Sequence, residues 1–389
     1  MSVFVTRPHF RIFASFFIYA LMLGAIYPRL GDLQQQMGVG EGALGAALIG
    51  AALGTQISLA FAQPLMQSIG YRWSMLLAVP MLGIAEVLAT TASSPLVFFG
   101  FQCVAGLAVG VVEMIINLEA DRVEHKIGRR IMSRAHAFWS FGFMAAAYLG
   151  AGFAQAHISP TMHLLILLVF VAVLNTYLFH DYVPAPSRNV EEGGGSRFVR
   201  PTPAILVLVT FTLSAMILEG ASLDWSVIYM RDVHHTQPWL NASTLGIFAM
   251  IMAISRFFAD GFVERFGPER VARTLVAIMG IGALSVALAP HPAISIFGFA
   301  CLGIGTSAIF PLSMSAAAQM TDRPAVVNVA SLAQISFVTF LLAPPLLGFV
   351  AEHFGIRWSY AIGLPFVILS WLTVHRILAG VKVETQVTD

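Results

Sequence analysis

The sequence DYVPAPSRNVEEGGGSRFVRPTP, residues 181–203, is a polar segment with four prolines and a run of three glycines. This composition is typical of a linker, because proline ends helices and glycine leaves the backbone free to move. No other polar stretch of comparable length interrupts the chain. We therefore predict an N-terminal unit over residues 1–180, a linker over residues 181–203 and a C-terminal unit over residues 204–389.

Six apolar segments lie on each side of this linker. A transmembrane helix needs roughly 20 mostly apolar residues. In the first half such segments lie at residues 10–30, 43–66, 74–92, 96–118, 135–156 and 161–180. In the second half they lie at residues 204–230, 242–262, 273–289, 293–316, 327–350 and 358–377. The sequence therefore predicts an all-α integral membrane protein with twelve transmembrane helices in two pseudo-symmetric six-helix bundles.

The composition agrees with a membrane protein. Of 389 residues, 58% are hydrophobic and 11% are charged, whereas a soluble protein carries about 25% charged residues. The net charge of +1 leaves no basic surplus for binding nucleic acid. The two cysteines, Cys103 and Cys301, lie in apolar runs and show neither a disulfide framework nor a metal-ligand spacing. We expect a protein that contacts the lipid bilayer and carries no metal or other cofactor.

The distribution of basic residues predicts the orientation, because loops rich in lysine and arginine stay on the cytoplasmic side. We place the N-terminus inside the cell. Of the 21 lysines and arginines, Arg29, Arg231 and Arg357 are then the ones in outward segments, and Arg256 is the one within a span. All the others lie in inward segments. Both termini and the linker are therefore predicted to be cytoplasmic.

Short repeats relate the two halves and their parts. The segment FGFQC at Phe99–Cys103 recurs as FGFAC at Phe297–Cys301, in the fourth predicted helix of each half. The segment IGYRWS at Ile69–Ser74 resembles FGIRWS at Phe354–Ser359. The latter two loops lie on opposite membrane faces in the predicted topology, which is expected if each half consists of two inverted three-helix units.

A loop in the second half carries a family signature. The segment DGFVERFGPER at Asp260–Arg270 resembles the signature between the second and third helices of each half in the major facilitator superfamily. The first half carries a degraded copy at residues 63–72, where Gln67 takes the position of an acidic residue. The resemblance extends along nearly the whole chain. It implies two bundles that face each other across a central cavity lined by helices 1, 4, 7 and 10, and that transport by alternating access.

Two further segments narrow this resemblance. Glu219–Ser226 (EGASLDWS) and His136–Ser140 (HAFWS) resemble a poorly characterised bacterial branch that is similar to the fucose–proton symporters. This resemblance implies a secondary transporter in the bacterial inner membrane. Its expected partners are a small-molecule substrate and the proton, and we expect it to act as a monomer.

The fourth predicted helix holds the strongest site candidate, Glu113. A carboxylate at bilayer depth is costly and is a functional candidate for that reason. Glu113 and Asn117 are four residues apart and share a helix face, while Gly106 and Gly110 permit close helix contact. The stretch resembles the fourth helix of fucose–proton symporters, which implies a role in proton coupling. A structural hydrogen bond is the alternative.

One feature of those symporters is missing here. They carry an acidic residue in the middle of the first helix, and residues 19–29 of this chain contain none. The nearest acidic residue is Asp32, close to the predicted outer end of the helix.

The seventh and eighth predicted helices hold further charges. Glu219 and Asp224 are candidates for substrate or proton contact, with a hydrogen bond near the outer surface as the alternative. Arg256 and Asp260 are four residues apart, so we predict an intrahelical ion pair with a structural or gating role. Arg29 and Asp32 are predicted to form an outer-gate pair or a solvated helix end. The gating candidates taken together are Arg256, Asp260, Glu264, Arg265, Arg29 and Asp32.

Polar and aromatic side chains complete the candidate site. Aromatic rings can stack on a sugar, although most aromatic residues of such a chain serve packing or anchor it at the interface. Pro311, after Gly303 and Gly305, predicts a bend in the tenth helix where backbone can line a cavity. The cavity-lining candidates are Tyr19, Tyr27, His136, Trp139, Ser140, Trp225, Phe310 and Gln334.

These observations favour a transporter over other classes of protein. The sequence shows no nucleotide-binding loop and no nucleophile motif, so we do not expect an enzyme. No segment is long enough for a soluble signalling domain. We predict proton-coupled uptake of a small polar solute, a sugar or a polyol. The alternative is efflux of amphipathic compounds by proton antiport, which would suit a pocket rich in Phe and Met.

Overall fold

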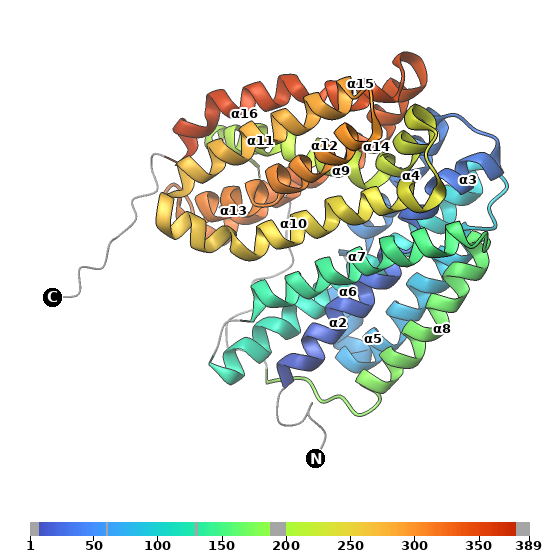
Figure 1. The fold of residues 1–389 in the computed structure, drawn as a ribbon. Coiled ribbons are helices and arrows are strands. Elements are labelled where there is room, and N and C mark those ends of the chain that lie inside the picture. The colour runs from blue at the N-terminus through green and yellow to red at the C-terminus, as the bar shows by residue number, and fades with distance from the viewer. Residues whose placement is uncertain (1–7, 60, 129–130, 187–199, 379–389) are drawn as a thin grey trace.

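The computed structural model describes residues 8–59, 61–128, 131–186 and 200–378, and these residues form helices joined by short turns (Figure 1). Most of the predicted linker and the tail after residue 378 lie outside the described residues. Helix α8 ends at Phe179 and helix α9 begins at Pro203, on either side of the linker.

The first half contains eight helical elements. They are α2 (Pro8–Gly24), η1 (Tyr27–Arg29), α3 (Leu30–Met37), α4 (Glu41–Leu59), α5 (Ala62–Ala89), α6 (Pro95–Ile127), α7 (Met132–Gln155) and α8 (Pro160–Phe179). The second half contains α9 (Pro203–His234), α10 (Pro238–Phe266), α11 (Pro268–Leu288), α12 (Pro292–Thr306), α13 (Ile309–Gln319), α14 (Ala325–Phe354), α15 (Ile356–Ala361) and α16 (Gly363–Leu378).

These elements make twelve membrane helices. Within the described ranges, eleven segments are long and apolar enough to cross a membrane. Three of them join consecutive helices: α2 to α3 form one span at Pro8–Met37, α12 with α13 forms another at Pro292–Gln319, and α15 with α16 forms a third at Ile356–Val374. Helix α4, with 19 residues, takes the place of the second helix of the first half. The predicted fold class is confirmed.

Three helices begin with the same cap. Ser94, Ser159 and Thr202 each precede a proline, and each side-chain oxygen accepts a hydrogen bond from a backbone N–H of the first turn. A hydroxyl at this position satisfies a donor that the helix leaves unpaired. Proline suits the next position because its missing N–H has no helical partner there. These N-cap residues therefore define where α6, α8 and α9 begin.

The repeated glycine turns adopt one backbone conformation. The values of φ and ψ are 78° and 160° at Gly70, 81° and 152° at Gly267, and 92° and 146° at Gly355. This region of φ and ψ is open almost only to glycine. A Cβ atom at any of the three would meet no atom within 4 Å, so the requirement comes from the backbone rather than from space. The sequence repeats therefore mark equivalent turns.

Small residues bring α4 and α6 into close contact. A Cβ atom added at Gly106 would lie 2.1 Å from the carbonyl oxygen of Ala51, and one added at Gly110 would lie 1.9 Å from Ser58 Oγ. From the facing helix, a Cβ atom at Gly54 would lie 2.1 Å from the carbonyl oxygen of Cys103. The predicted close contact along the Gly106–Gly110 face is confirmed, and it fixes the rotation of the helix that carries Glu113.

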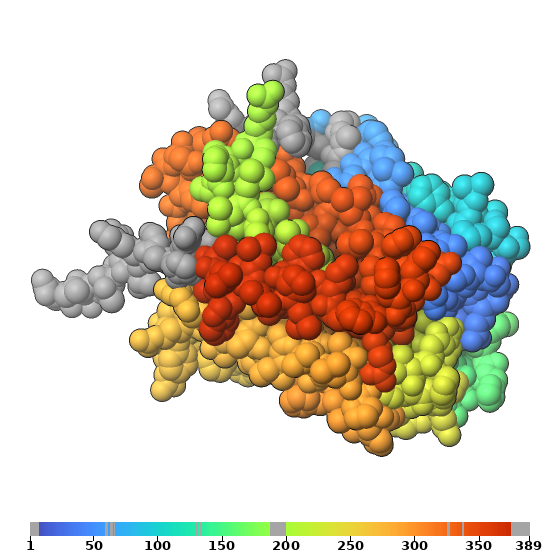
Figure 2. All heavy atoms as spheres, turned by 90° about the horizontal axis from the view of Figure 1, so that it is seen from above, coloured from blue at the N-terminus to red at the C-terminus, as the bar shows by residue number. Residues whose placement is uncertain are grey.

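The outer surface of the helices is apolar. Large side chains such as Leu77, Val173, Phe257 and Leu372 are between 59% and 67% exposed. Figure 2 shows one such face, crossed by α16, whose Ile368 and Leu372 are exposed. Apolar area on this scale is unfavourable in water and is stable against lipid. The chain is therefore a multi-pass membrane protein.

The two halves meet closely at one end. A Cβ atom at Gly45 of α4 would lie 2.4 Å from the carbonyl oxygen of Pro344 in α14. A Cβ atom at Gly246 of α10 would lie 2.9 Å from the ring of Tyr148 in α7. From this contact α7 and α10 diverge toward their other ends (Figure 1). By the predicted orientation, the closed end is the outer one.

Candidate functional site

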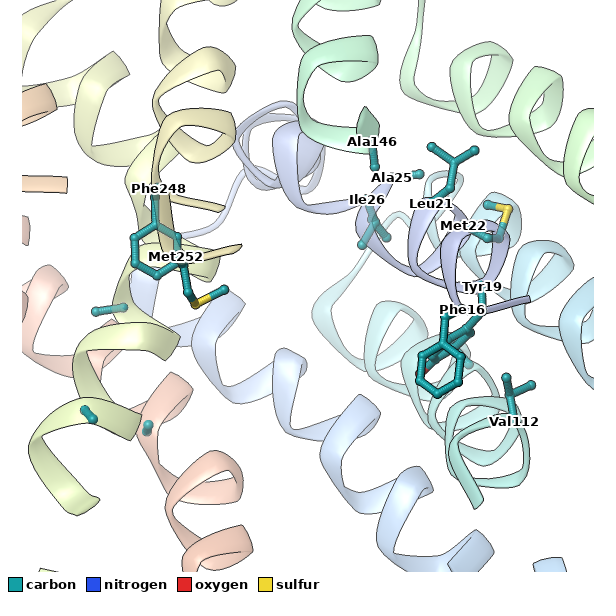
Figure 3. Packing of buried hydrophobic residues seen from close by; sticks show 14 of the residues in the cluster. Phe16, Tyr19, Leu21, Met22, Ala25, Ile26, Val112, Ala146, Phe248 and Met252 are labelled. Carbon is teal, nitrogen blue, oxygen red and sulfur yellow. The ribbon is translucent and has the colours of Figure 1, made fainter. Parts of the chain in front are cut away.

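The candidate site begins at the middle of α2, where Tyr19 is fully buried. Figure 3 shows Tyr19 and Phe16 of α2 beside Val112 of α6, and shows Phe248 and Met252 on α10 of the other half. Val112 directly precedes Glu113 in the chain. The first and fourth membrane helices thus bring Tyr19 and Glu113 to the same region.

Glu113 is half-buried and has a polar but uncharged neighbourhood. Asn117 Nδ2 donates to the Glu113 carboxylate at 3.2 Å and to the Glu113 carbonyl oxygen at 2.8 Å, so the predicted shared face is confirmed. The Tyr19 hydroxyl lies beside the Glu113 carboxyl group, which is its hydrogen-bonding neighbour. No described lysine, arginine or histidine forms an ion pair with Glu113.

Glu219 forms an ion pair in the second half. Arg256 Nη2 of α10 donates to Glu219 Oε1 of α9 at 3.1 Å, and Arg256 Nε donates to the carbonyl oxygen of Ser307 at 2.8 Å. Ser307 lies in the break between α12 and α13, so its carbonyl group has left the regular helical ladder. The predicted bend in the tenth membrane helix is confirmed, and the arginine satisfies backbone that the bend exposes.

The predicted intrahelical pair between Arg256 and Asp260 is wrong. Asp260 is exposed and forms no ion pair among the described residues. The spacing of four allows such a contact, but Arg256 turns instead toward Glu219 on α9 and toward the Ser307 carbonyl oxygen between α12 and α13, and it donates to both. Glu264 and Arg265 are also exposed at the end of α10, and Arg265 lies over the ring of Phe266. Their gating role stays a prediction.

Asp224 lies farther along α9 and is 9% exposed. Among the described residues it makes no hydrogen bond and no ion pair, and its electrostatic neighbours include Tyr27 of η1 and Tyr360 of α15. Tyr27 belongs to the first half and Asp224 to the second, so the two groups interact electrostatically across the halves. The side chain of the next residue, Trp225, is fully buried, and its Nε1 has no partner in the described structure.

The start of α7 presents three candidates in different surroundings. His136 is exposed, with its ring edge-to-face on Phe16 at 5.2 Å between centroids. Trp139 stacks on Phe143 at 5.5 Å, and its buried Nε1 has no described partner. Ser140 is buried and donates to the His136 carbonyl oxygen, a local bond within the helix. His136 and Trp139 are therefore available to a ligand, whereas the hydroxyl of Ser140 is occupied.

The remaining cavity candidates lie on α13 and α14. Phe310, one residue before Pro311, is half-buried just after the helix break, and Gln334 is half-buried in the middle of α14. Their assignment to the cavity stays a prediction.

Arg29 and Asp32 form the predicted pair, with Nε and Oδ2 2.6 Å apart. This pair does not connect the halves, because the second contact of Arg29 is with the carbonyl oxygen of Ile158 in the same half. The pair holds η1 and α3 against the loop before α8, and its assignment to an outer gate or a solvated helix end stays a prediction.

The contacts that do connect the halves were not predicted. Arg231 of α9 donates to the carbonyl oxygen of Gly31 and to Gln34 Oε1, both at 2.7 Å. Glu352 of α14 accepts from the backbone N–H of Gly42 at 2.8 Å. The hydrogen bonds between described residues of the two halves lie at this one end. Arg231 carried a signal in the sequence, since it is one of three arginines in segments predicted to face outward.

Two buried carboxylates of the first half lie outside the candidate site. Glu119, near the end of α6, accepts hydrogen bonds from Tyr182 Oη and from the backbone N–H of Ala185, both at 2.6 Å. It thereby anchors the start of the linker. Glu86 of α5 is 1% exposed and accepts from Gln102 Nε2 at 3.1 Å. Glu86 is thus a hydrogen-bonded core residue.

A pocket of roughly 350 Å³ lies between α5 and α6. Its lining is apolar and includes Leu77, Met81, Leu88 and Val104, which are exposed on the outer face. Such a groove suits lipid chains rather than a polar solute.

Comparison with known proteins places these features in a family. The sequence matches the family model described as Major Facilitator Superfamily at residues 12–337 and again at residues 262–385. It is 28% identical to an uncharacterized transporter, y4wD, of Sinorhizobium fredii, over 90% of this chain and 92% of that protein. It is 24% identical to the membrane protein MosC of Rhizobium meliloti, over 95% of this chain and 88% of that protein.

Solved structures share the fold. A D-xylose–proton symporter aligns with a TM-score of 0.77 at 14% identity, covering 96% of this chain and 98% of that chain. The nucleoside transporter NupG aligns with a TM-score of 0.71 at 12% identity, over 96% and 98%. The fucose:proton symporter FucP of E. coli aligns with a TM-score of 0.61 at 15% identity, over 95% and 98%. At such identities the likeness concerns the fold alone.

Proposed function

This chain belongs to the major facilitator superfamily of transporters, and from that premise we propose that it takes up a small polar solute, a sugar or a polyol, together with protons. Glu113 is the proposed proton site. The observation that carries the proposal is the surroundings of its carboxyl group, which lies in the middle of a membrane helix with Asn117 and Tyr19 beside it and no described cation paired to it.

The depth of Glu113 in the bilayer favours its protonated form. A carboxylate without a cation is costly in a low-dielectric site, and a proton removes the charge. If the two halves change conformation most readily when Glu113 is neutral, transport requires that Glu113 bind a proton first. Substrate and proton then favour the same conformations, and their binding free energies are coupled.

An unpaired donor supports a polar solute. The Trp139 indole N–H is buried and lacks a partner among the described residues, and the Tyr19 hydroxyl lies beside the Glu113 carboxyl group. A buried donor without an acceptor costs free energy, which a ligand oxygen recovers. Hydroxyl groups of a sugar or polyol provide such oxygens. The D-xylose–proton and fucose:proton symporters that share the fold are named for ligands of this class.

We also propose the membrane in which the protein lies and the side to which the described conformation opens. Basic residues outside the spans concentrate on one side, which we assign to the cytoplasm of a bacterial inner membrane, with both termini there. The end closed by Arg231 and Glu352 then faces outward. The described conformation is inward-facing, and one copy of the chain contains the proposed site.

Thermal unfolding of the detergent-purified protein tests this function, because ligands that bind the folded state raise its apparent stability. The ligands are sugars, polyols, organic acids and amphipathic cations, each at two pH values. We expect stabilisation by a polyhydroxy compound that depends on pH, and loss of that pH dependence in Glu113→Gln. Glu269→Gln, which changes a surface carboxyl group paired with Arg273 at the start of α11, is the control and should keep it. Stabilisation by amphipathic cations alone would favour proton-antiport efflux instead.

A further inference from the structure

The apolar groove between α5 and α6 has the length of one lipid acyl chain. Its lining on α5 begins at Leu76 and ends at Leu88, and Phe101 and Val104 line it from α6. From Leu76 to Leu88 the helix rises about 18 Å. This is close to the thickness of one lipid leaflet, since the hydrocarbon core of a bilayer measures about 30 Å. The groove therefore suits one chain of a lipid that belongs to a single leaflet.

An exposed apolar stripe on α5 connects this groove to the membrane edge. Trp73, Leu77, Ile84 and Leu88 recur at helical spacing and are between 42% and 59% exposed. Residues three or four apart share a helix face, so Trp73 lies one turn before Leu77, which lines the groove. Tryptophan is enriched where a span meets the lipid headgroups. Trp73 therefore marks the end of the groove that lies next to the headgroups.

Arg72 lies at this end of the groove without a counter-ion. Its Cζ is 5.3 Å from the centroid of the Trp73 ring, which places the guanidinium group beside the exposed stripe. The side chain is half-buried, its Nε is buried, and it forms no hydrogen bond or ion pair with a described residue. A ring face attracts a cation but does not neutralise it. Since a buried donor without an acceptor costs free energy, Arg72 favours an anionic ligand.

The sequence around Arg72 contains no acidic residue that could balance its charge. Arg72 is the one charged residue between positions 42 and 85. The equivalent turn of the second half differs, because Glu269 stands two residues after its glycine, where the first half has Arg72, and Glu269 pairs with Arg273 at 2.8 Å. The protein therefore balances the charge at the second turn and leaves that of Arg72 for a ligand.

We propose that an anionic phospholipid of the phosphatidylglycerol type binds here, with its phosphate on Arg72 and one acyl chain in the groove between α5 and α6. A guanidinium group binds phosphate oxygens through paired N–H donors. Phosphatidylglycerol has no cation in its headgroup, whereas the ammonium group of a choline lipid competes with Arg72 for the phosphate. By the proposed orientation this end is cytoplasmic, where basic residues beside a span attract anionic lipids. The site is independent of the transported solute.

Thermal unfolding of the full-length protein in detergent tests the site, because a bound lipid raises the apparent stability. The probes are dioleoylphosphatidylglycerol, dioleoylphosphatidylcholine and sn-glycerol 3-phosphate, at equal ionic strength. We expect the glycerol lipid to reach half of its maximal effect at a concentration lower than that of the choline lipid by on the order of tenfold or more, because it gains an uncontested charge-assisted hydrogen bond. Glycerol 3-phosphate, which has no acyl chain, should have no effect.

Variants separate the headgroup contact from the groove. Arg72→Gln should remove the preference for the glycerol lipid, and Arg72→Lys should retain part of it. Val104→Trp places a ring in the groove and should weaken the binding of the glycerol lipid without a change in charge. Two controls should keep the full preference: Arg270→Gln, at an exposed arginine at the start of α11, and Leu372→Trp, at an exposed position of α16.

Three results would overturn the inference. Equal effects of the two lipids on the unmodified protein would mean that no site distinguishes their headgroups. A preference for the glycerol lipid that persists in both Arg72→Gln and Val104→Trp would place the lipid elsewhere on the surface. Stabilisation by glycerol 3-phosphate as strong as that by the lipid would assign Arg72 to a soluble phosphate and leave the groove without a role. None of these results would affect the proposed uptake of a polar solute.

Discussion

The carboxylate of Glu352 accepts a hydrogen bond at 2.8 Å from the backbone N–H of Gly42, a residue 310 positions earlier in the chain. Gly42 lies in the first turn of α4, where helical N–H groups lack intrahelical partners and the helix dipole favours a negative charge. Glu352 thus closes α14 of the second half onto α4 of the first. Arg231 makes equivalent contacts from α9 to Gly31 and Gln34. In a transporter that alternates, both contacts have to break before this end opens.

The glycine contact beside Glu352 gives a first prediction. A Cβ atom at Gly45 would lie 2.4 Å from the Pro344 carbonyl oxygen, and the backbone there cannot withdraw. We expect Gly45→Val to hold the outer end apart, so that solute binding persists while uptake falls at least tenfold. Gly152→Ala, at a helical glycine with no atom within 4 Å of its added Cβ, should transport normally. Normal uptake by Gly45→Val would contradict this assignment of the gate.

The Arg231 contacts give a second prediction. Arg231→Gln removes two hydrogen bonds of 2.7 Å between the halves, so the population open at the outer end should rise. Spin labels at the exposed positions Gln35 and Gln237 would report this as a longer distance in pulsed electron paramagnetic resonance. Arg357→Gln is the control, because Arg357 donates to Ala287 within its own half. A distance distribution unchanged by Arg231→Gln would show that this contact does not control opening.

The glycine turns give a prediction about stability. At Gly267 the φ of 81° and ψ of 152° strain any other residue, so Gly267→Ala should cost about 1–3 kcal/mol. Gly261→Ala, six residues earlier on the exposed face of α10, should leave stability unchanged or raise it slightly, since alanine favours a helix. Thermal unfolding of both variants in the same detergent compares them. Equal midpoints would mean that the turn relaxes to an ordinary conformation.

The anchor of the linker gives another prediction about stability. Glu119 is fully buried and accepts from Tyr182 and from the N–H of Ala185. Glu119→Ala leaves both donors unpaired and should cost about 1–3 kcal/mol. Glu119→Gln keeps one acceptor oxygen and should cost less. Limited proteolysis near the linker checks the location of the effect, which should be faster cleavage in Glu119→Ala; an unchanged cleavage rate would contradict the anchoring role.

The architecture was predictable because it depends on composition along the chain. Twelve apolar segments and one polar linker specify the helices, since lipid requires each span to satisfy its own backbone hydrogen bonds. Contacts within a helix were also predictable, because they depend on spacing along the chain. Glu113 and Asn117 meet because they are four residues apart. The equivalence of the glycine turns was visible in the sequence, because the segments around Gly70 and Gly355 are similar.

Contacts between helices were not predictable from one sequence. Spacing shows which residues share a face, but packing decides which neighbour that face meets. Arg256 therefore pairs with Glu219 on another helix rather than with Asp260 on its own. Arg231 and Glu352 reach partners in the opposite half, and no local pattern predicts such a pair.

The most direct test of the central claim is transport by Glu113→Gln in proteoliposomes. The solute is whichever of D-xylose and L-fucose stabilises the purified protein more. The account predicts that an inward-directed proton gradient drives accumulation by the unmodified protein but not by Glu113→Gln, while the variant still exchanges labelled for unlabelled solute at equilibrium. Accumulation by Glu113→Gln against the solute gradient would contradict proton coupling at this residue.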